Sequence, residues 1–159
     1  MGELQVRGPW VAGAYYDQPD AADRWTDDGW LRTGDVVDID SEGYLRICDR
    51  TKDLVRSGGE WISSQALENA LMNHEDVLEA AVIAVAHPKW QERPIAVVVP
   101  RAGVGVDEAK LRAHLAASFP KWWLPDSIVA VDAIPKTSTG KFEKTRLREQ
   151  FAEWQAEHR

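Results

Sequence analysis

The stretch that decides the fold runs from Cys48 to Ser64 and reads CDRTKDLVRSGGEWISS. Charged residues open it, and the chain then turns apolar at residues 54–55 and again at residues 61–62. Gly58-Gly59 lies between these two apolar pairs. Two strand-like pieces around a Gly-Gly turn predict a β-hairpin. Adjacent glycines also let the backbone approach a ligand closely, because no Cβ stands in the way.

The composition is that of a globular protein with a core of its own. The chain has 159 residues, of which 44% are hydrophobic and 28% charged, enough for one ordinary domain or a small domain with an extra piece. The net charge of −7 argues against a nucleic-acid binder. The one cysteine, Cys48, excludes a disulfide within the chain. We expect no transmembrane segment and a cytoplasmic location, because no long apolar run or signal-peptide pattern is found.

The first fifty residues predict a few short β-strands and little else. Two strands are expected at residues 3–6 and 10–16, separated by Gly8-Pro9. A second pair is expected at residues 36–39 and 44–48, joined by the turn Asp40–Gly43. This is too little structure for a domain, and residues 1–51 are expected to be the end of a larger one.

The remainder predicts a small α+β domain with a β-hairpin and a three-stranded sheet flanked by helices. Continuous apolar runs predict the three strands, at residues 77–86, 95–99 and 127–131. Apolar residues at helical spacing predict three helices: Gln65 to Asn73 capped by Ser64, one capped by Asp107 and ended by Pro120, and Lys144 to about His158 with Leu147, Phe151 and Trp154 on one face.

Several common signatures fail. Glu108 occupies the third glycine position of a dinucleotide loop that would begin at Gly103. Thr139-Gly140-Lys141 resembles the end of a P-loop, but Phe142 replaces the hydroxyl residue that would bind a metal. The four histidines lack metal-ligand spacing, so no metal site is expected within the chain.

Three widely spaced groups remain as candidate sites. Thr33-Gly34-Asp35, expected at the end of a turn, supplies a carboxylate that could accept hydrogen bonds from a ribose diol, or is a plain turn. Arg50 and Lys52 would alone be a solvated surface cluster. The loop from Pro135 to Lys141 would alone be an ordinary exposed loop, although residues 136–148 are rich in basic side chains and could suit an anionic small ligand.

In this order, the three groups resemble the C-terminal third of the adenylate-forming superfamily. That superfamily holds acyl-CoA synthetases, luciferases and the adenylation domains of peptide synthetases. The segments SGGEWIS and HPKWQERP are most similar to medium- and long-chain fatty-acyl-CoA ligases. The resemblance implies that residues 1–51 are a remnant of the large N-terminal adenylation domain, and that residues 52–159 are the mobile C-terminal domain.

The resemblance also implies substrates and roles. A fatty acid or other carboxylic acid is joined to AMP with ATP and Mg, which the large domain mainly holds, and then passed to CoA. Asp35 and Arg50 would bind the ribose hydroxyls of ATP, and Lys141 would reach the α-phosphate and the substrate carboxylate. Lys52 would be the hinge. The residues expected to line the pantetheine channel are Arg56, Ser57, Gly58, Gly59 and Glu60.

Two alternatives remain open at this stage. The chain could be a fragment of an adenylation domain whose acceptor is a carrier protein, or a non-catalytic module that binds CoA or a nucleotide. One departure from the family is Ala66, where a Glu is usual. The phosphate loop and the acyl pocket lie outside this chain, so we expect the chain to need the large N-terminal domain of the same protein and to be inactive alone.

Overall fold

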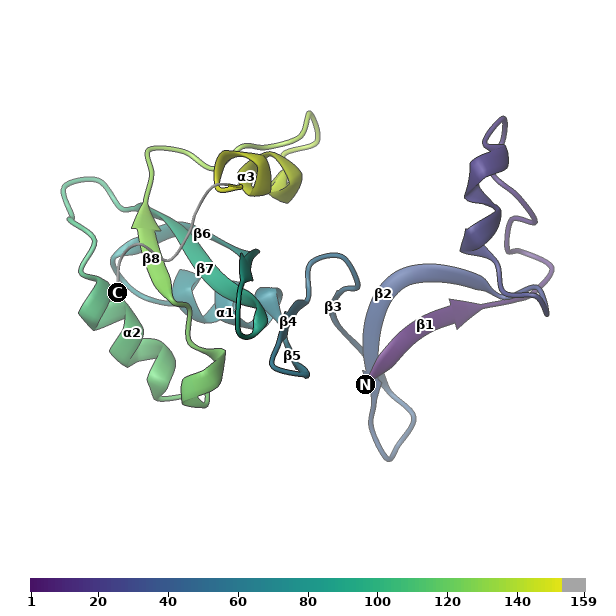
Figure 1. The fold of residues 1–159 in the computed structure, drawn as a ribbon, viewed down its shortest axis with the longest axis horizontal. Coiled ribbons are helices and arrows are strands. Elements are labelled where there is room, and N and C mark those ends of the chain that lie inside the picture. Colours follow the sequence, from purple (N-terminus) through teal and green to yellow (C-terminus); the bar gives the residue numbers. More distant parts are fainter. Residues whose placement is uncertain (153–159) are drawn as a thin grey trace. The chain divides into compact units, whose positions relative to one another are not determined.

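The computed structural model describes residues 1–152. By their internal contacts the residues fall into two compact units, Met1–Lys52 and Asp53–Arg159. Figure 1 labels the helices and strands of both. Among the described residues, no helix combines the length and apolar character needed to cross a bilayer.

The first unit is a three-stranded antiparallel sheet in the order β1-β2-β3. Its strands are β1 (Gly2–Val6), β2 (Leu31–Ile39) and β3 (Leu45–Arg50), and a 3-10 helix, η1 (Pro19–Arg24), precedes β2. The turn between β2 and β3 is the predicted one: Asp40 Oδ1 accepts from the amides of Glu42 and Tyr44, at 2.9 Å each. A carboxylate that satisfies two turn amides explains why this hairpin forms at Asp40.

The predicted strand at residues 10–16 is wrong. The chain forms turns and bends there, beginning with the amide of Val11, which donates to the carbonyl of Gly8 at 3.0 Å. Trp10 and Tyr16 are both 97% exposed, so their apolar side chains do not mark a buried strand face. The pairing of β1 with β2 ends at Val6, and the Gly8-Pro9 turn follows. The apolar residues after this turn therefore have no strand partner, and the apolar pattern does not mark a strand.

The second unit contains one five-stranded sheet built around a central strand. The predicted hairpin and the three predicted strands all belong to it: β4 (Val55–Ser57), β5 (Glu60–Ile62), β6 (Val77–His87), β7 (Gln91–Pro100) and β8 (Ser127–Ala130). β6 pairs with β7 antiparallel along its whole length, and β8 pairs with β7 in parallel. β4 reaches β7 at a single position, Ser57 opposite Gln91.

Helices cover both faces of this sheet. α1 (Ser64–Met72) and α2 (Glu108–Ala116) pack on one face, whereas α3 (Lys144–Gln150) packs on the other (Figure 1). The sheet contributes alternate residues to the two cores: Ala80 and Val82 to the first, Ala81 and Ile83 to the second. Burial on both faces explains why residues 80–86 of β6 form a continuous apolar run.

The helix ends follow local capping chemistry. Ser63, rather than the predicted Ser64, caps α1, and its side chain accepts from the amide of Ala66 at 3.1 Å. Asp107 caps α2 as predicted and accepts from the amide of Lys110 at 3.1 Å. α3 ends at Gln150. The predicted continuation of this helix to Trp154 and His158 lies outside the described residues.

Candidate functional site

Asp35 and Arg50 are brought together in the first unit. They lie opposite each other on β2 and β3, and Arg50 Nε donates to Asp35 Oδ1 at 2.8 Å. The Arg50 side chain is 59% exposed and that of Asp35 is 23% exposed, so both reach solvent. A guanidinium has five N–H donors and a carboxylate has several acceptor positions. The pair can therefore both donate to and accept from the hydroxyls of a ligand.

The Thr33-Gly34-Asp35 segment lies within β2 and not at the end of a turn, which corrects the sequence-based placement. The turn-like signal has a local cause, since Gly34 adopts a φ of +75° inside the strand. Thr33 Oγ1 accepts from the amide of Asp35 at 3.1 Å and donates to the carbonyl of Leu4 at 2.9 Å. These bonds hold the backbone at Asp35 against the neighbouring strand β1.

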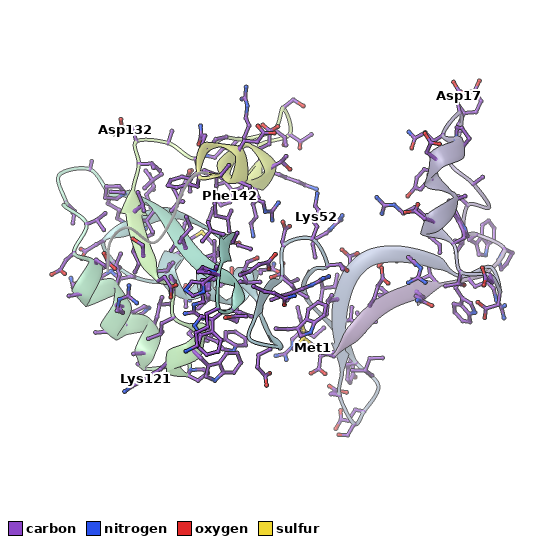
Figure 2. All side chains as sticks on the ribbon, viewed as in Figure 1. Met1, Asp17, Lys52, Lys121, Asp132 and Phe142 are labelled. Atoms are coloured by element: carbon purple, nitrogen blue, oxygen red, sulfur yellow. The ribbon has the colours of Figure 1, made fainter. Side chains whose placement is uncertain are left out.

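Lys52 is the last residue of the first unit and lies in the turn between β3 and β4 (Figure 2). Its side chain is exposed. The amide of Thr51, just before it, donates to the carbonyl of Gly34 at 2.8 Å. Asp53, just after it, pairs with Arg148 of α3 at 2.5 Å. Lys52 is thus the residue between an anchor in one unit and an anchor in the other.

The Gly58-Gly59 turn joins β4 to β5, as predicted. Both glycines have positive φ values, +60° and +87°, which is typical of the two-residue turn that matches the twist of a hairpin. The amide of Gly58 donates to the carbonyl of Trp90 at 3.0 Å. A Cβ at Gly58 would lie 3.0 Å from Trp90 Cε3, whereas a Cβ at Gly59 would meet nothing within 4 Å. Trp90 therefore packs closely on one side of the turn.

The other hairpin residues differ in where their side chains go. Arg56 places its guanidinium 5.1 Å from the centre of the Trp61 ring, and its amide donates to Glu92 at 2.8 Å. Glu60 is exposed. Ser57 is only 7% exposed, and its Oγ accepts from Arg93 Nη1 at 3.0 Å. The Ser57 side chain thus points into the protein, while its neighbours present the hairpin to solvent.

Arg93 is a residue that the sequence-based reasoning missed. Besides Ser57, its guanidinium donates to the carbonyls of Trp122 at 2.7 Å and Leu124 at 2.9 Å, and to Asp126 at 2.9 Å. The residue is 9% exposed. It ties the hairpin to the segment that leads into β8. The available signal was an arginine placed directly before the apolar run of β7.

The loop that carries Lys141 is closed by its own backbone. Thr137 and Lys141 form two bonds: the Thr137 amide donates to the Lys141 carbonyl at 2.8 Å, and the Lys141 amide donates to Thr137 Oγ1 at 3.2 Å. A bridge between Lys136 and Phe142 joins the two legs of the loop. Gly140, with a φ of +80°, makes the sharp turn just before Lys141. Lys141 therefore lies on a turn that is held by hydrogen bonds.

Most of the basic side chains of residues 136–148 are paired with carboxylates. The pairs are Lys136–Glu79, Lys144–Glu68, Arg146–Glu143 and Arg148–Asp53. Lys141 is exposed and forms no ion pair with any residue of the described part of the chain. Among the described residues, Lys141 is thus the basic side chain of this group without a carboxylate partner, and it is available to an anionic ligand.

The described residues 1–152 were also compared with the side-chain clusters that hold metal ions. They contain no group of three or more His, Cys, Asp and Glu side chains placed to hold a metal ion.

Comparison with known proteins shows which family this chain is similar to. Residues 66–141 match the AMP-binding enzyme C-terminal domain. The chain is 55% identical to a long-chain-fatty-acid–CoA ligase of Thermus thermophilus and 49% identical to a 3-methylmercaptopropionyl-CoA ligase of Ruegeria pomeroyi. Each match covers 95% of this chain and 28% of the relative, so the chain spans little more than a quarter of these proteins.

Two solved structures share the fold of nearly the whole chain. The crystal structure of ATP-bound MatB from Rhodopseudomonas palustris superposes with a TM-score of 0.84 at 34% identity, over 94% of this chain and 30% of that one. The amide bond synthetase McbA from Marinactinospora thermotolerans superposes equally well, also at 0.84 and 34% identity, over 95% of this chain and 31% of that one. Residues 66–141 thus match the AMP-binding enzyme C-terminal domain, and the chain shares its fold with these two solved structures.

Proposed function

We propose that this chain is the C-terminal part of an ATP-dependent ligase that joins a fatty acid or a related carboxylic acid to CoA. The observation that carries the proposal is Lys141, an exposed cation on a hydrogen-bonded turn, whose basic neighbours are already paired with carboxylates. The names of the two relatives above, a long-chain fatty-acid ligase and a 3-methylmercaptopropionyl ligase, support CoA as the acceptor. They also support an acid with an aliphatic chain.

In this proposal Lys141 acts at the adenylation step. The substrate carboxylate attacks the α-phosphate of ATP, pyrophosphate leaves, and negative charge builds on the phosphoryl oxygens. A fixed cation lowers the barrier where that charge develops. The exposed Asp35–Arg50 pair would hold the ribose hydroxyls, with Asp35 accepting and Arg50 donating.

In the second step the CoA thiol replaces AMP on the acyl group, and we assign the hairpin to that step. The backbone of Gly58-Gly59 would line the channel for the pantetheine arm, with Arg56 and Glu60 at its solvent side. The thiol and Lys141 both need the same reacting centre. We therefore propose that the C-terminal unit pivots at Lys52 between the two steps, as hinge residues do in other enzymes that close around ligands. Alone, the chain is expected not to adenylate an acid.

The test is Lys141→Ala in the full-length ligase, with the two half-reactions measured separately. The rate of adenylation, measured as pyrophosphate release, should fall by about a hundredfold or more. This is the usual loss when one charge-stabilising group is removed. Thioester formation from supplied acyl adenylate should stay within about threefold, because Lys141 serves only the first step. Lys121→Ala, at another exposed lysine, is the matched control.

Equal loss of both half-reactions in Lys141→Ala would contradict the assigned role. The acceptor is tested in the same enzyme by offering CoA or a carrier protein. If calorimetry showed that the 159-residue chain alone binds CoA, the alternative that the chain is a non-catalytic CoA-binding module would be favoured.

A further inference from the structure

We propose that Glu68 is a positioning residue for Lys141, acting through Lys144. The inference rests on the proposed function, since it concerns the lysine assigned to adenylation. Glu68 lies on α1, on the face of the sheet opposite α3, and is 7% exposed. Its Oε1 lies 2.6 Å from Lys144 Nζ, at the first residue of α3. Lys144 follows Lys141 by three residues.

Glu68 is itself fixed by the backbone of the sheet. The same Oε1 accepts from the amide of Val82 in β6 at 2.7 Å. On the other side of the pair, Lys144 Nζ also donates to Ser64 Oγ at 2.8 Å, and Ser64 is fully buried. Lys144 is thus held by two groups of α1, one of which is bound to the central sheet. A displacement of α3 would have to break these contacts together.

The other leg of the Lys141 loop is held in a parallel way. Lys136 Nζ lies 2.5 Å from Glu79 Oε1 of β6, and 5.7 Å from the centre of the Phe142 ring. Phe142 packs against the core cluster that contains Leu147 (Figure 2). Each leg of the loop therefore has a lysine paired with a glutamate of the main body. The inner pair, Lys144–Glu68, is the more buried, with side-chain exposures of 13% and 9% against 41% and 25%.

Because the pair is buried, we infer that it fixes the position of α3 and does not add to the stability of the fold. Replacing a buried ion pair with apolar side chains of similar size is often neutral or stabilising, because both charges lose their hydration when buried. What the pair supplies is a fixed distance and direction between α1 and the first residue of α3. A misplacement of about 1 Å at a reacting group can reduce a rate about a hundredfold. The loop that presents Lys141 gains that precision from Glu68.

The first test uses Glu68→Gln in the full-length ligase. We expect the kcat of adenylation to fall by about tenfold or more, while thioester formation from supplied acyl adenylate changes by less than about twofold. Lys144→Arg, which keeps the cation, should retain more activity than Lys144→Met. Glu108→Gln is the matched control, because it breaks an ion pair with Arg112 on α2, away from the loop.

A second readout does not depend on activity. In the 159-residue chain, amide hydrogen exchange at Gly140 and Lys141 should speed up in Glu68→Gln, while exchange at Val97 in the core stays unchanged. If Glu68→Gln fails to fold, the double variant Glu68→Leu with Lys144→Met removes both charges and keeps the packing. It should fold and still show fast exchange in the 159-residue chain and slow adenylation in the full-length ligase.

The outcomes separate this inference from the proposed function. If Lys141→Ala stops adenylation but Glu68→Gln and the double variant affect both half-reactions equally, or neither, the positioning role is overturned. If Lys141→Ala leaves adenylation intact, the proposed function fails. Exchange at Gly140 and Lys141 then still decides whether Glu68 fixes the loop, and unchanged exchange would overturn that claim as well.

Discussion

Two adjacent glycines in the hairpin carry different constraints. Gly58 and Gly59 both adopt positive φ, a conformation that costs a residue with a Cβ about 1–2 kcal/mol. Only Gly58 also has a neighbour in the way, because its Cβ would stand 3.0 Å from Trp90 Cε3. Gly59 opens to space on the side where a Cβ would point. A substitution at Gly59 thus incurs only the cost of the positive φ, whereas one at Gly58 also incurs a steric contact with Trp90.

Gly58→Ala should therefore destabilise the second unit more than Gly59→Ala does. We expect about 1–2 kcal/mol for Gly59→Ala and about 1 kcal/mol more for Gly58→Ala, the usual order for overpacking against a ring. Urea unfolding followed by far-UV circular dichroism measures both. The double variant Gly58→Ala with Trp90→Ala tests the cause, because without the ring the extra cost at Gly58 should disappear. Equal losses in the two single variants would show that Trp90 does not constrain the turn.

At the scale of elements, one arginine reinforces a junction that few backbone bonds hold together. β4 meets β7 at a single pair of residues, so the hairpin has little backbone pairing with the rest of the sheet. Arg93, at the start of β7, adds bonds to Ser57 of β4, to the carbonyls of Trp122 and Leu124, and to Asp126. The position of the hairpin relative to the sheet thus depends on a side chain.

Arg93→Met should loosen this junction. Removing one partner of a buried charged network leaves the others unsatisfied, and we expect a loss of about 2–4 kcal/mol in the free energy of unfolding. Exchange of the Gly58 amide should also become faster, because the hairpin loses its anchor. Arg101→Met, at an exposed arginine, should change stability by less than about 0.5 kcal/mol. A loss at Arg93 no larger than at Arg101 would show that the network does not support the hairpin.

The sequence predicted elements better than it predicted their connections. The strands of the second unit were predicted because apolar runs mark burial, and Asp107 was predicted as a cap from local chemistry. The pairing of β4 with β7 was not predicted, because Ser57 and its strand partner Gln91 lie far apart in the sequence. The strand predicted at residues 10–16 is absent because the apolar residues Trp10 and Tyr16 are exposed, so an apolar pattern there does not mark burial.

The same division holds for the candidate site. Motif order alone pointed to Asp35, Arg50 and Lys141, but it gave no sign that the first two are cross-strand neighbours. It also gave no sign of the Glu68–Lys144 contact, which joins residues on opposite faces of the sheet. Contacts of this kind depend on the packing of the whole unit. Sequence periodicity shows which face of a helix is buried, but not what a buried carboxylate meets.

For the whole molecule, the question is where a pivot between the units could lie. Thr51 is bonded to Gly34 of β2, inside the first unit. Asp53 is paired with Arg148 of α3, and Leu54 next to it is 4% exposed, inside the second unit. A change of backbone angles at either of these flanking positions would break contacts within a unit. Lys52 lies between the two anchors, so the local structure supports it as the proposed hinge.

Lys52→Pro in the full-length ligase should therefore separate the two half-reactions. Proline fixes φ near −65°, and a hinge with one fixed angle can reach only one of two poses. We expect one half-reaction to fall by about tenfold or more while the other stays near its normal rate, because in the proposed function each pose serves one step. Lys52→Ala removes the same side chain but keeps the backbone free, so it should spare both steps. If Lys52→Pro leaves both half-reactions intact, the pivot lies elsewhere. If Lys52→Ala causes the same selective loss, the side chain rather than the backbone angle is what matters at this position.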